Sequence, residues 1–135
     1  MNQNREQTAI IVVDHGSRLQ QSNQMLVEVV AAYRQQSGWP IVEPAHMELA
    51  EPTIADAFNR CVQQGAQRVI VFPYFLGPGN HSTKDIPRLV AEAAARHSGI
   101  GYQVASPIGL HSSVLQVIDD RIDECLQAKW PSASN

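Results

Sequence analysis

The stretch TAIIVVDHGSR, residues 8–18, decides the fold of this chain. Its first half is a continuous apolar run rich in β-branched side chains, which is typical of a strand covered on both faces. The chain then leaves the strand through Asp14, His15 and Gly16, and a glycine lets the backbone bend there and approach a ligand closely. A helical pattern follows, so the stretch predicts the first strand–helix unit of a parallel sheet.

Three further strand-like runs alternate with helical patterns along the rest of the 135 residues. Strands are predicted at residues 8–13, 41–47, 68–72 and 102–105, and helices at residues 19–36, 53–64, 85–97 and 113–129. Strictly alternating strands and helices predict an α/β fold with a four-stranded parallel sheet, βαβαβαβα, and right-handed crossovers. We expect one domain, residues 1–135, with a core over about residues 8–129 and polar tails at both ends.

Two of the predicted helices carry apolar stripes at spacings of three and four residues. In the first helix Leu26, Val29, Val30 and Tyr33 form the stripe. In the last helix the stripe consists of Val114, Leu115, Ile118, Ile122, Cys125 and Leu126. Both cysteines, Cys61 and Cys125, fall in helical patterns and are expected to pack on helix faces.

The composition is that of an ordinary globular protein. Hydrophobic residues make up 44% of the chain and charged residues 17%, and the formal net charge is −3. Lysines and arginines are scattered, so nucleic-acid binding is not expected. No apolar stretch approaches the roughly 20 residues that cross a bilayer, and the polar N-terminus lacks a signal-peptide pattern. We therefore expect a cytoplasmic protein without membrane contact.

Two histidines and one carboxylate follow three of the predicted strands. They are His15 after the first strand, Glu48 after the second and His81 after the third. The carboxyl ends of parallel strands share one edge of the sheet, so these side chains should meet in one crevice. Two imidazoles and a carboxylate are typical ligands of a divalent transition metal with coordination positions left open. The sequence thus predicts a metal site at this edge.

Other interpretations of the first two segments stay open. His15 could be a plain loop residue, and the HGSR motif has some likeness to histidine phosphatases, although Asp14 stands where that chemistry requires an arginine. Ser17 can cap the following helix. Glu51 is equally explained as an acidic residue at a helix N-terminus. His46 is expected to pack between the sheet and a helix.

A long glycine-rich loop, residues 76–85, precedes the third helix and contains His81. Such loops more often take part in function than serve only to connect two elements. The alternative is a flexible loop with a capping box over residues 82–85. Aromatic residues Tyr74 and Phe75, next to Leu76, could cover a ligand or be ordinary core. His111, after the fourth strand, could line the rim of the site or be a plain loop residue.

With these motifs in place, the chain closely resembles the small sirohydrochlorin chelatases, the CbiX/SirB type of the class II chelatases. The segments that carry the resemblance are DHGSR, MELAEPTI and FPYFLGPGNHSTKDIP, within a similarity that runs over about residues 9–126. The resemblance implies a flavodoxin-like, chelatase-like three-layer sandwich. It also implies a homodimer, because longer relatives fuse two such halves and this chain has one.

The resemblance further implies insertion of Fe²⁺ or Co²⁺ into sirohydrochlorin, for sirohaem or cobalamin biosynthesis. His15, Glu48 and His81 would bind the metal, and the two histidines would assist removal of pyrrole protons. The metal is then a substrate, and no tightly bound cofactor is expected. Candidates for binding the carboxylates of the tetrapyrrole lie near the same edge: Ser17, Arg18, Lys84 and Arg88. The three charged residues could equally be solvated surface charges.

Two functions of other classes remain open from the sequence. A metal or tetrapyrrole carrier that uses the same residues would bind stoichiometrically without turnover. A phosphohydrolase built on HGSR would release phosphate and insert no metal.

Overall fold

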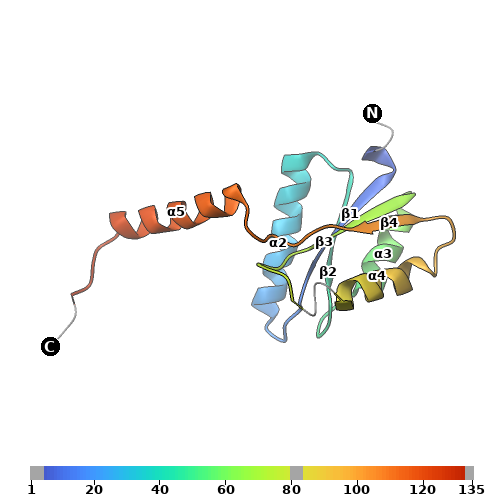
Figure 1. The fold of residues 1–135 in the computed structure, drawn as a ribbon, viewed down its shortest axis with the longest axis horizontal. Helices are drawn as coiled ribbons and strands as arrows, with labels where there is room; N and C mark the ends of the chain where they lie inside the picture. The colour runs from blue at the N-terminus through green and yellow to red at the C-terminus, as the bar shows by residue number, and fades with distance from the viewer. Residues whose placement is uncertain (1–4, 80–83, 133–135) are drawn as a thin grey trace.

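The computed structural model describes residues 5–79 and 84–132. Along the chain the elements alternate as the sequence predicts (Figure 1). They are β1 (Thr8–Asp14), α2 (Gln20–Ser37), β2 (Ile41–His46), α3 (Ile54–Gln63), β3 (Arg68–Pro73), α4 (Ile86–Ala94), β4 (Gly101–Val104) and α5 (Ser112–Gln127). Every boundary lies within three residues of its predicted position.

The four strands form one parallel sheet in the order β2-β1-β3-β4. In the register of this sheet Val13 of β1 lies between Ala45 of β2 and Pro73 of β3. The predicted α/β fold with a four-stranded parallel sheet is therefore confirmed. Because all strands run in the same direction, the chain leaves β1, β2 and β3 at a common edge, where ligands of such sheets bind.

Alternate residues of β1 face two separate apolar layers. Ile11 and its neighbours on the same face pack with α3 and α4, in a layer that includes the fully buried Phe58. Ile10 and Val12 point to the other face and pack with Leu26 and Val30 of α2. This arrangement explains the uninterrupted apolar run of β1, because each face of the strand is covered by helices.

Local signals in the sequence fix where the helices begin and end. Thr53 and Asp56 form a reciprocal capping box at the start of α3, which satisfies two backbone N–H groups. Gly38 ends α2 in the left-handed conformation, with φ of +77°. Pro87 lies in the first turn of α4, where its missing N–H costs little.

The last helix departs from the expectation. We expected Cys125 to pack on its helix face, but every residue of the described helix α5, Cys125 included, is exposed or only half-buried. Figure 1 shows α5 projecting past α2, away from the sheet. The packing prediction for Cys125 was wrong, because the spacing of apolar residues does not say what a helix face packs against.

Among the described residues, no helix combines the length and the apolar character that crossing a bilayer requires.

The two cysteines differ sharply in environment. Cys61 lies on the buried face of α3, whereas Cys125 is exposed on α5. Burial, with a smaller contribution from the negative charge of Glu43, raises the pKa of the Cys61 thiol to about 12 from 9.0. At pH 9 the folded protein should therefore hold roughly one thousandth of Cys61 as the reactive thiolate, against about half in the unfolded chain.

We expect iodoacetamide at pH 9 to leave Cys61 unmodified in the folded Cys125→Ser variant and to alkylate it fully in urea. Intact-protein mass spectrometry measures the adduct. The sign of the pKa shift also predicts that folding stability falls between pH 9 and about pH 12, where only the unfolded chain ionises this thiol. Rapid alkylation of the native variant would contradict the burial of Cys61.

Candidate functional site

His15 and Glu48 meet at the carboxyl edge of the sheet, as the sequence predicts. His15 directly follows β1, and Glu48 lies two residues beyond the end of β2. The Nε2 atom of His15 is 3.2 Å from Oε1 of Glu48. Their side chains are 41% and 51% exposed, respectively, so both can reach a ligand that approaches from solvent.

The backbone holds these two residues side by side beyond the ends of their strands. The N–H of Met47 donates to the carbonyl oxygen of Asp14 at 2.9 Å, and the N–H of Glu48 donates to that of His15 at 3.1 Å. The ladder between β1 and β2 thus continues for two more bonds. The position of Glu48 relative to His15 is therefore set by the main chain and not by the side-chain contact alone.

Gly16 allows this close approach. Its φ is +90°, in the left-handed region that favours glycine. A Cβ atom at this position would lie 1.8 Å from the carbonyl oxygen of Glu48, which is far inside van der Waals contact. The glycine of the DHGSR motif is therefore required both by the turn and by the neighbouring strand end.

Asp14 and His46 form a second pair directly beneath the first. Nδ1 of His46 is 2.6 Å from Oδ1 of Asp14, and His46 is 1% exposed. The N–H of His46 also donates to the carbonyl oxygen of Pro52 at 2.8 Å, which draws the start of the next segment against the strand. The expected burial of His46 is confirmed. The contact with Asp14 was not predicted from the sequence; the β1–β2 register places Asp14 opposite His46.

The segment after His15 is fixed by Asn23 rather than by a serine cap. We expected Ser17 to cap α2, but the helix begins at Gln20 after Leu19, whose side chain makes no capping bond. Instead the N–H of Leu19 donates to Oγ of Ser17 at 3.0 Å. The side chain of Asn23 reaches back, accepting from the N–H of Ser17 at 3.0 Å and donating to its carbonyl oxygen at 2.7 Å.

A polar hollow of about 350 Å³ opens between this segment and the end of β2. Arg18 is exposed and lines it, with Ser17 and Asn23 on the same side and His46 and Glu51 opposite. Of the predicted tetrapyrrole-binding residues, Ser17 and Arg18 therefore line a hollow that also includes Leu49, the residue after Glu48. Most of the hollow's exposed lining is polar, so the surface suits a polar or charged group better than an apolar ring.

The third predicted site residue cannot be placed. His81 lies outside the described residues, as do Ser82 and Thr83. Beyond them Lys84 is exposed at the start of the α4 region. Arg88 of α4 is 58% exposed and is 3.1 Å from Glu92, so its guanidinium group already has a carboxylate neighbour.

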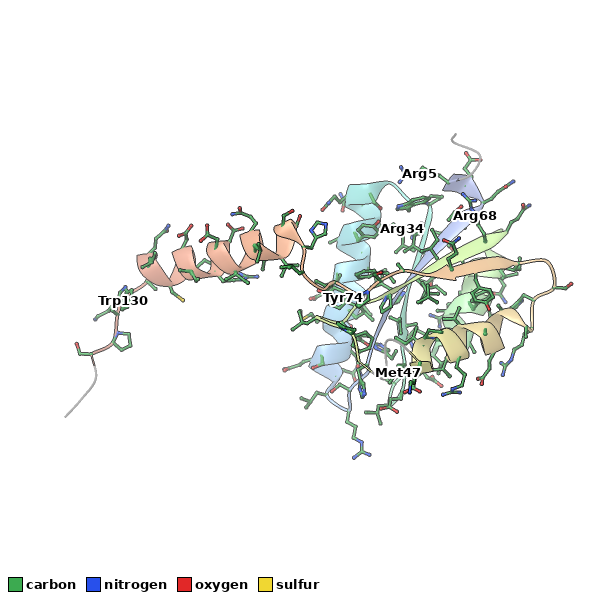
Figure 2. All side chains as sticks on the ribbon, viewed as in Figure 1. Arg5, Arg34, Met47, Arg68, Tyr74 and Trp130 are labelled. Atoms are coloured by element: carbon green, nitrogen blue, oxygen red, sulfur yellow. The ribbon has the colours of Figure 1, made fainter. Side chains whose placement is uncertain are left out.

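The aromatic residues after β3 separate onto different faces. Tyr74, labelled in Figure 2, packs with the apolar layer that includes Leu26 and Val30 of α2. Its ring makes an edge-to-face contact with that of Phe72, with centroids 6.4 Å apart. Phe75 packs against the layer under α3 and α4, and Leu76 is 81% exposed. His111 begins α5, and its Nδ1 accepts from the N–H of Ser113 at 3.1 Å. The core interpretation thus fits Tyr74 and Phe75, and a capping role fits His111.

An imidazole nitrogen and a carboxylate oxygen at 3.2 Å can bind one divalent ion from the same side. Among residues 5–79 and 84–132 no group of three or more histidine, cysteine, aspartate or glutamate side chains is close enough to hold a metal. The described part of the site therefore provides two ligands on an open edge. Such a site can receive and release an ion, unlike a closed structural site.

Comparisons with known proteins cover most of the chain. The CbiX family profile matches residues 9–125. The chloroplastic sirohydrochlorin ferrochelatase of Arabidopsis thaliana is 58% identical over 117 residues, which cover 87% of this chain and 52% of that protein. The sirohydrochlorin cobaltochelatase of Methanocaldococcus jannaschii is 44% identical over 89 residues, covering 66% of this chain and 62% of that protein.

Solved structures share the fold. The sirohydrochlorin chelatase SirB from Bacillus subtilis subspecies spizizenii, in complex with cobalt, has a TM-score of 0.82 and 33% identity over 87% of this chain and 50% of that one. A CbiX protein from Marinobacter aquaeolei, described as a protein of cobalamin biosynthesis, has a TM-score of 0.76 and 30% identity over 89% of this chain and 98% of that one.

The chain spans about half the length of the Arabidopsis protein and of SirB. The match nevertheless covers β1 through most of α5, and with it His15, Glu48 and the segment that contains His81. The resemblance inferred from the sequence motifs is confirmed: the chain belongs to the CbiX family.

Proposed function

We propose that this protein inserts Fe²⁺ or Co²⁺ into sirohydrochlorin. The observation that carries the proposal is the contact between His15 and Glu48 at the open carboxyl edge of the sheet. Support comes from the relatives, which are named as sirohydrochlorin ferrochelatases and cobaltochelatases, and from the family match over residues 9–125, a range that includes both residues.

In this proposal His15, Glu48 and His81 divide the work of metal insertion. The reaction exchanges one divalent ion for two pyrrole N–H protons, so the site has to hold the ion and accept protons. Glu48 offsets the charge of the ion, and a neutral imidazole either ligates the ion or takes a proton near neutral pH. Each ring nitrogen can take only one of these roles at a time, and the proposal divides them between His15 and His81.

The Asp14–His46 pair has a positioning role in the proposal. Asp14 directly precedes His15 in the chain and pairs with His46 in the sheet. Nδ1 of His46 is 2.6 Å from Oδ1 of Asp14, and the His46 side chain is only 1% exposed. A satisfied buried pair of this kind rigidifies its surroundings. It would keep the ends of β1 and β2 at a fixed separation while His15 and Glu48 bind and release an ion.

Basic side chains at the rim would bind the carboxylates of the tetrapyrrole. Arg18 lines the polar hollow beside Glu51, and Lys84 is exposed. These two residues are the stronger candidates, because Arg88 is already engaged with Glu92. Oγ of Ser17 accepts from the backbone of Leu19, which leaves its O–H group to donate to a carboxylate.

The proposal includes a homodimer as the working form. Cytoplasmic location stays a prediction, and the name of the Arabidopsis relative places that protein in the chloroplast.

Iron and cobalt are both retained as substrates. Nitrogen and oxygen ligands follow the general affinity order of divalent metals, so the ligand types do not distinguish Fe²⁺ from Co²⁺.

The test is anaerobic metal insertion followed by the absorbance change of sirohydrochlorin, with Fe²⁺ and Co²⁺ in separate assays. We expect many turnovers per protein chain, faster than insertion in buffer or with heat-denatured protein. The metal with the higher kcat/KM would identify the physiological substrate. Binding of one equivalent of metal or tetrapyrrole without acceleration would overturn the enzyme proposal and leave a carrier.

A further inference from the structure

Leu49 combines two unfavourable features at the edge of the site. Among residues 5–79 and 84–132 it is the one non-glycine residue with a positive φ, which is +70°. The left-handed region suits glycine and asparagine and is unfavourable for leucine. The apolar side chain is also 54% exposed, so burial in this fold compensates for only part of the strain. Strain of this kind next to a site points to a functional role for the residue.

The connection between β2 and α3 holds this backbone in place from both sides. The N–H of His46 donates to the carbonyl oxygen of Pro52 at 2.8 Å, which ties the two ends of the connection together. Within it the N–H of Glu48 donates to the carbonyl oxygen of His15 at 3.1 Å. Leu49 follows directly, so neighbouring main-chain bonds determine its backbone conformation, whatever side chain it carries.

The core does not require the side chain of Leu49. Met47, labelled in Figure 2, packs against the apolar layer of α3 and α4, whereas Leu49 belongs to neither apolar layer of the described residues. Instead it lines the polar hollow together with Arg18 and Glu51. An apolar side chain therefore faces solvent next to the proposed metal ligand Glu48, on the wall of a hollow that suits charged groups.

Sirohydrochlorin has a matching distribution of apolar and charged groups. Its ring is flat and apolar, its carboxylates lie at the periphery, and the inserted ion lies at its centre. A ring centred over His15 and Glu48 passes over the residue that follows Glu48, while a carboxylate at the ring edge can enter the hollow beside Arg18. An apolar side chain at that point removes ring surface from water, which favours binding.

We propose that Leu49 is a substrate-binding residue that contacts the apolar ring of the tetrapyrrole beside Glu48. This inference rests on the proposed function and adds a residue to it. The side chain becomes fully buried only when the ring is bound, which accounts for a leucine at a backbone position that suits asparagine or glycine better. Leu49 binds the ring and takes no part in holding the ion, so its loss should raise KM and leave kcat nearly unchanged.

The decisive variant is Leu49→Asn, which keeps a similar size, suits the left-handed backbone and removes the apolar surface. We expect a KM for sirohydrochlorin raised about 10-fold, the effect of losing about half of a leucine's burial. The melting temperature should equal or exceed that of the wild type. Leu49→Met should keep the wild-type KM. The matched control is Met25→Gln, because Met25 is 57% exposed on α2 and does not line the hollow.

Two binding measurements separate contact with the ring from displacement of Glu48. Fluorescence titration of metal-free sirohydrochlorin should give a Kd about 10-fold higher for Leu49→Asn than for the wild type. Calorimetric titration of Co²⁺ should give the same Kd for both proteins, because the metal ligands are unchanged.

An unchanged Kd for sirohydrochlorin in Leu49→Asn would overturn the role of Leu49. A weakened affinity for Co²⁺ would overturn it too, since the substitution would then act through Glu48, and a melting temperature lowered by more than about 5 °C would show that Leu49 stabilises the fold instead. Absence of turnover in the wild type, with the difference in tetrapyrrole affinity intact, would overturn only the proposed enzyme activity. The two failures are therefore distinguishable.

Discussion

His15→Ala is expected to lower kcat/KM for metal insertion at least about 100-fold, with little change in folding stability. The size follows from the loss of a group that binds the ion or accepts a proton, a contribution of about 10²–10⁴ in other enzymes. Stability should change little because the side chain is 41% exposed. Anaerobic insertion of Fe²⁺ and Co²⁺ measures the rate, and thermal unfolding measures stability.

The matched control is His111→Ser. His111 accepts a hydrogen bond from Ser113 at the start of α5, and serine is an equally good helix cap, so this variant should retain the wild-type rate. His81→Ala and Glu48→Gln should lose activity as His15→Ala does, if the three residues act together. Wild-type turnover by His15→Ala would remove this histidine from the proposed mechanism, whatever the other variants do.

Gly16→Ala should cost more than about 3 kcal/mol of the free energy of unfolding. The left-handed backbone at φ +90° costs a non-glycine residue about 1–2 kcal/mol. The added Cβ would also lie 1.8 Å from the carbonyl oxygen of Glu48, so the end of β2 must move. Urea unfolding at equilibrium measures the loss, and insertion activity should fall as well, because the shift displaces Glu48 from His15.

Gly38→Ala isolates the backbone contribution. Gly38 has a similar φ of +77°, but no described atom lies within 4 Å of a Cβ built there. This variant should therefore lose only about 1–2 kcal/mol. Equal losses for the two variants would show that the close approach of Gly16 to Glu48 is not what makes a glycine necessary in the DHGSR motif.

The sheet could be predicted from the sequence because its signals are local. Continuous β-branched runs at β1 and β3, Gly38 after α2 and Pro87 in α4 each fix a piece of structure within a few residues. The meeting of His15 with Glu48 could be predicted too, since parallel strands bring their carboxyl ends together. The predicted third member, His81, lies outside the described residues and stays a prediction.

What could not be predicted depends on long-range geometry. The Asp14–His46 pair requires the register between β1 and β2, which strand patterns alone do not give. Ser17 is a residue type that caps helices, but here its own backbone N–H group donates to the side chain of Asn23, in the first turn of α2. The stripe of α5 shows that one side of the helix is apolar, and nothing in its spacing tells whether the surface it covers belongs to the same chain.

The bonds from residues 108 and 109 to Phe75 and Leu76 have a consequence for thermodynamic linkage. They join the stretch that leads into α5 to the stretch that leads into the loop containing His81. If association of two chains restricts one stretch, it restricts the other, and a ligand whose binding restricts the second stretch must strengthen association by the same factor. Affinity for the tetrapyrrole would then rise with protein concentration, although no side chain of α5 belongs to the described site.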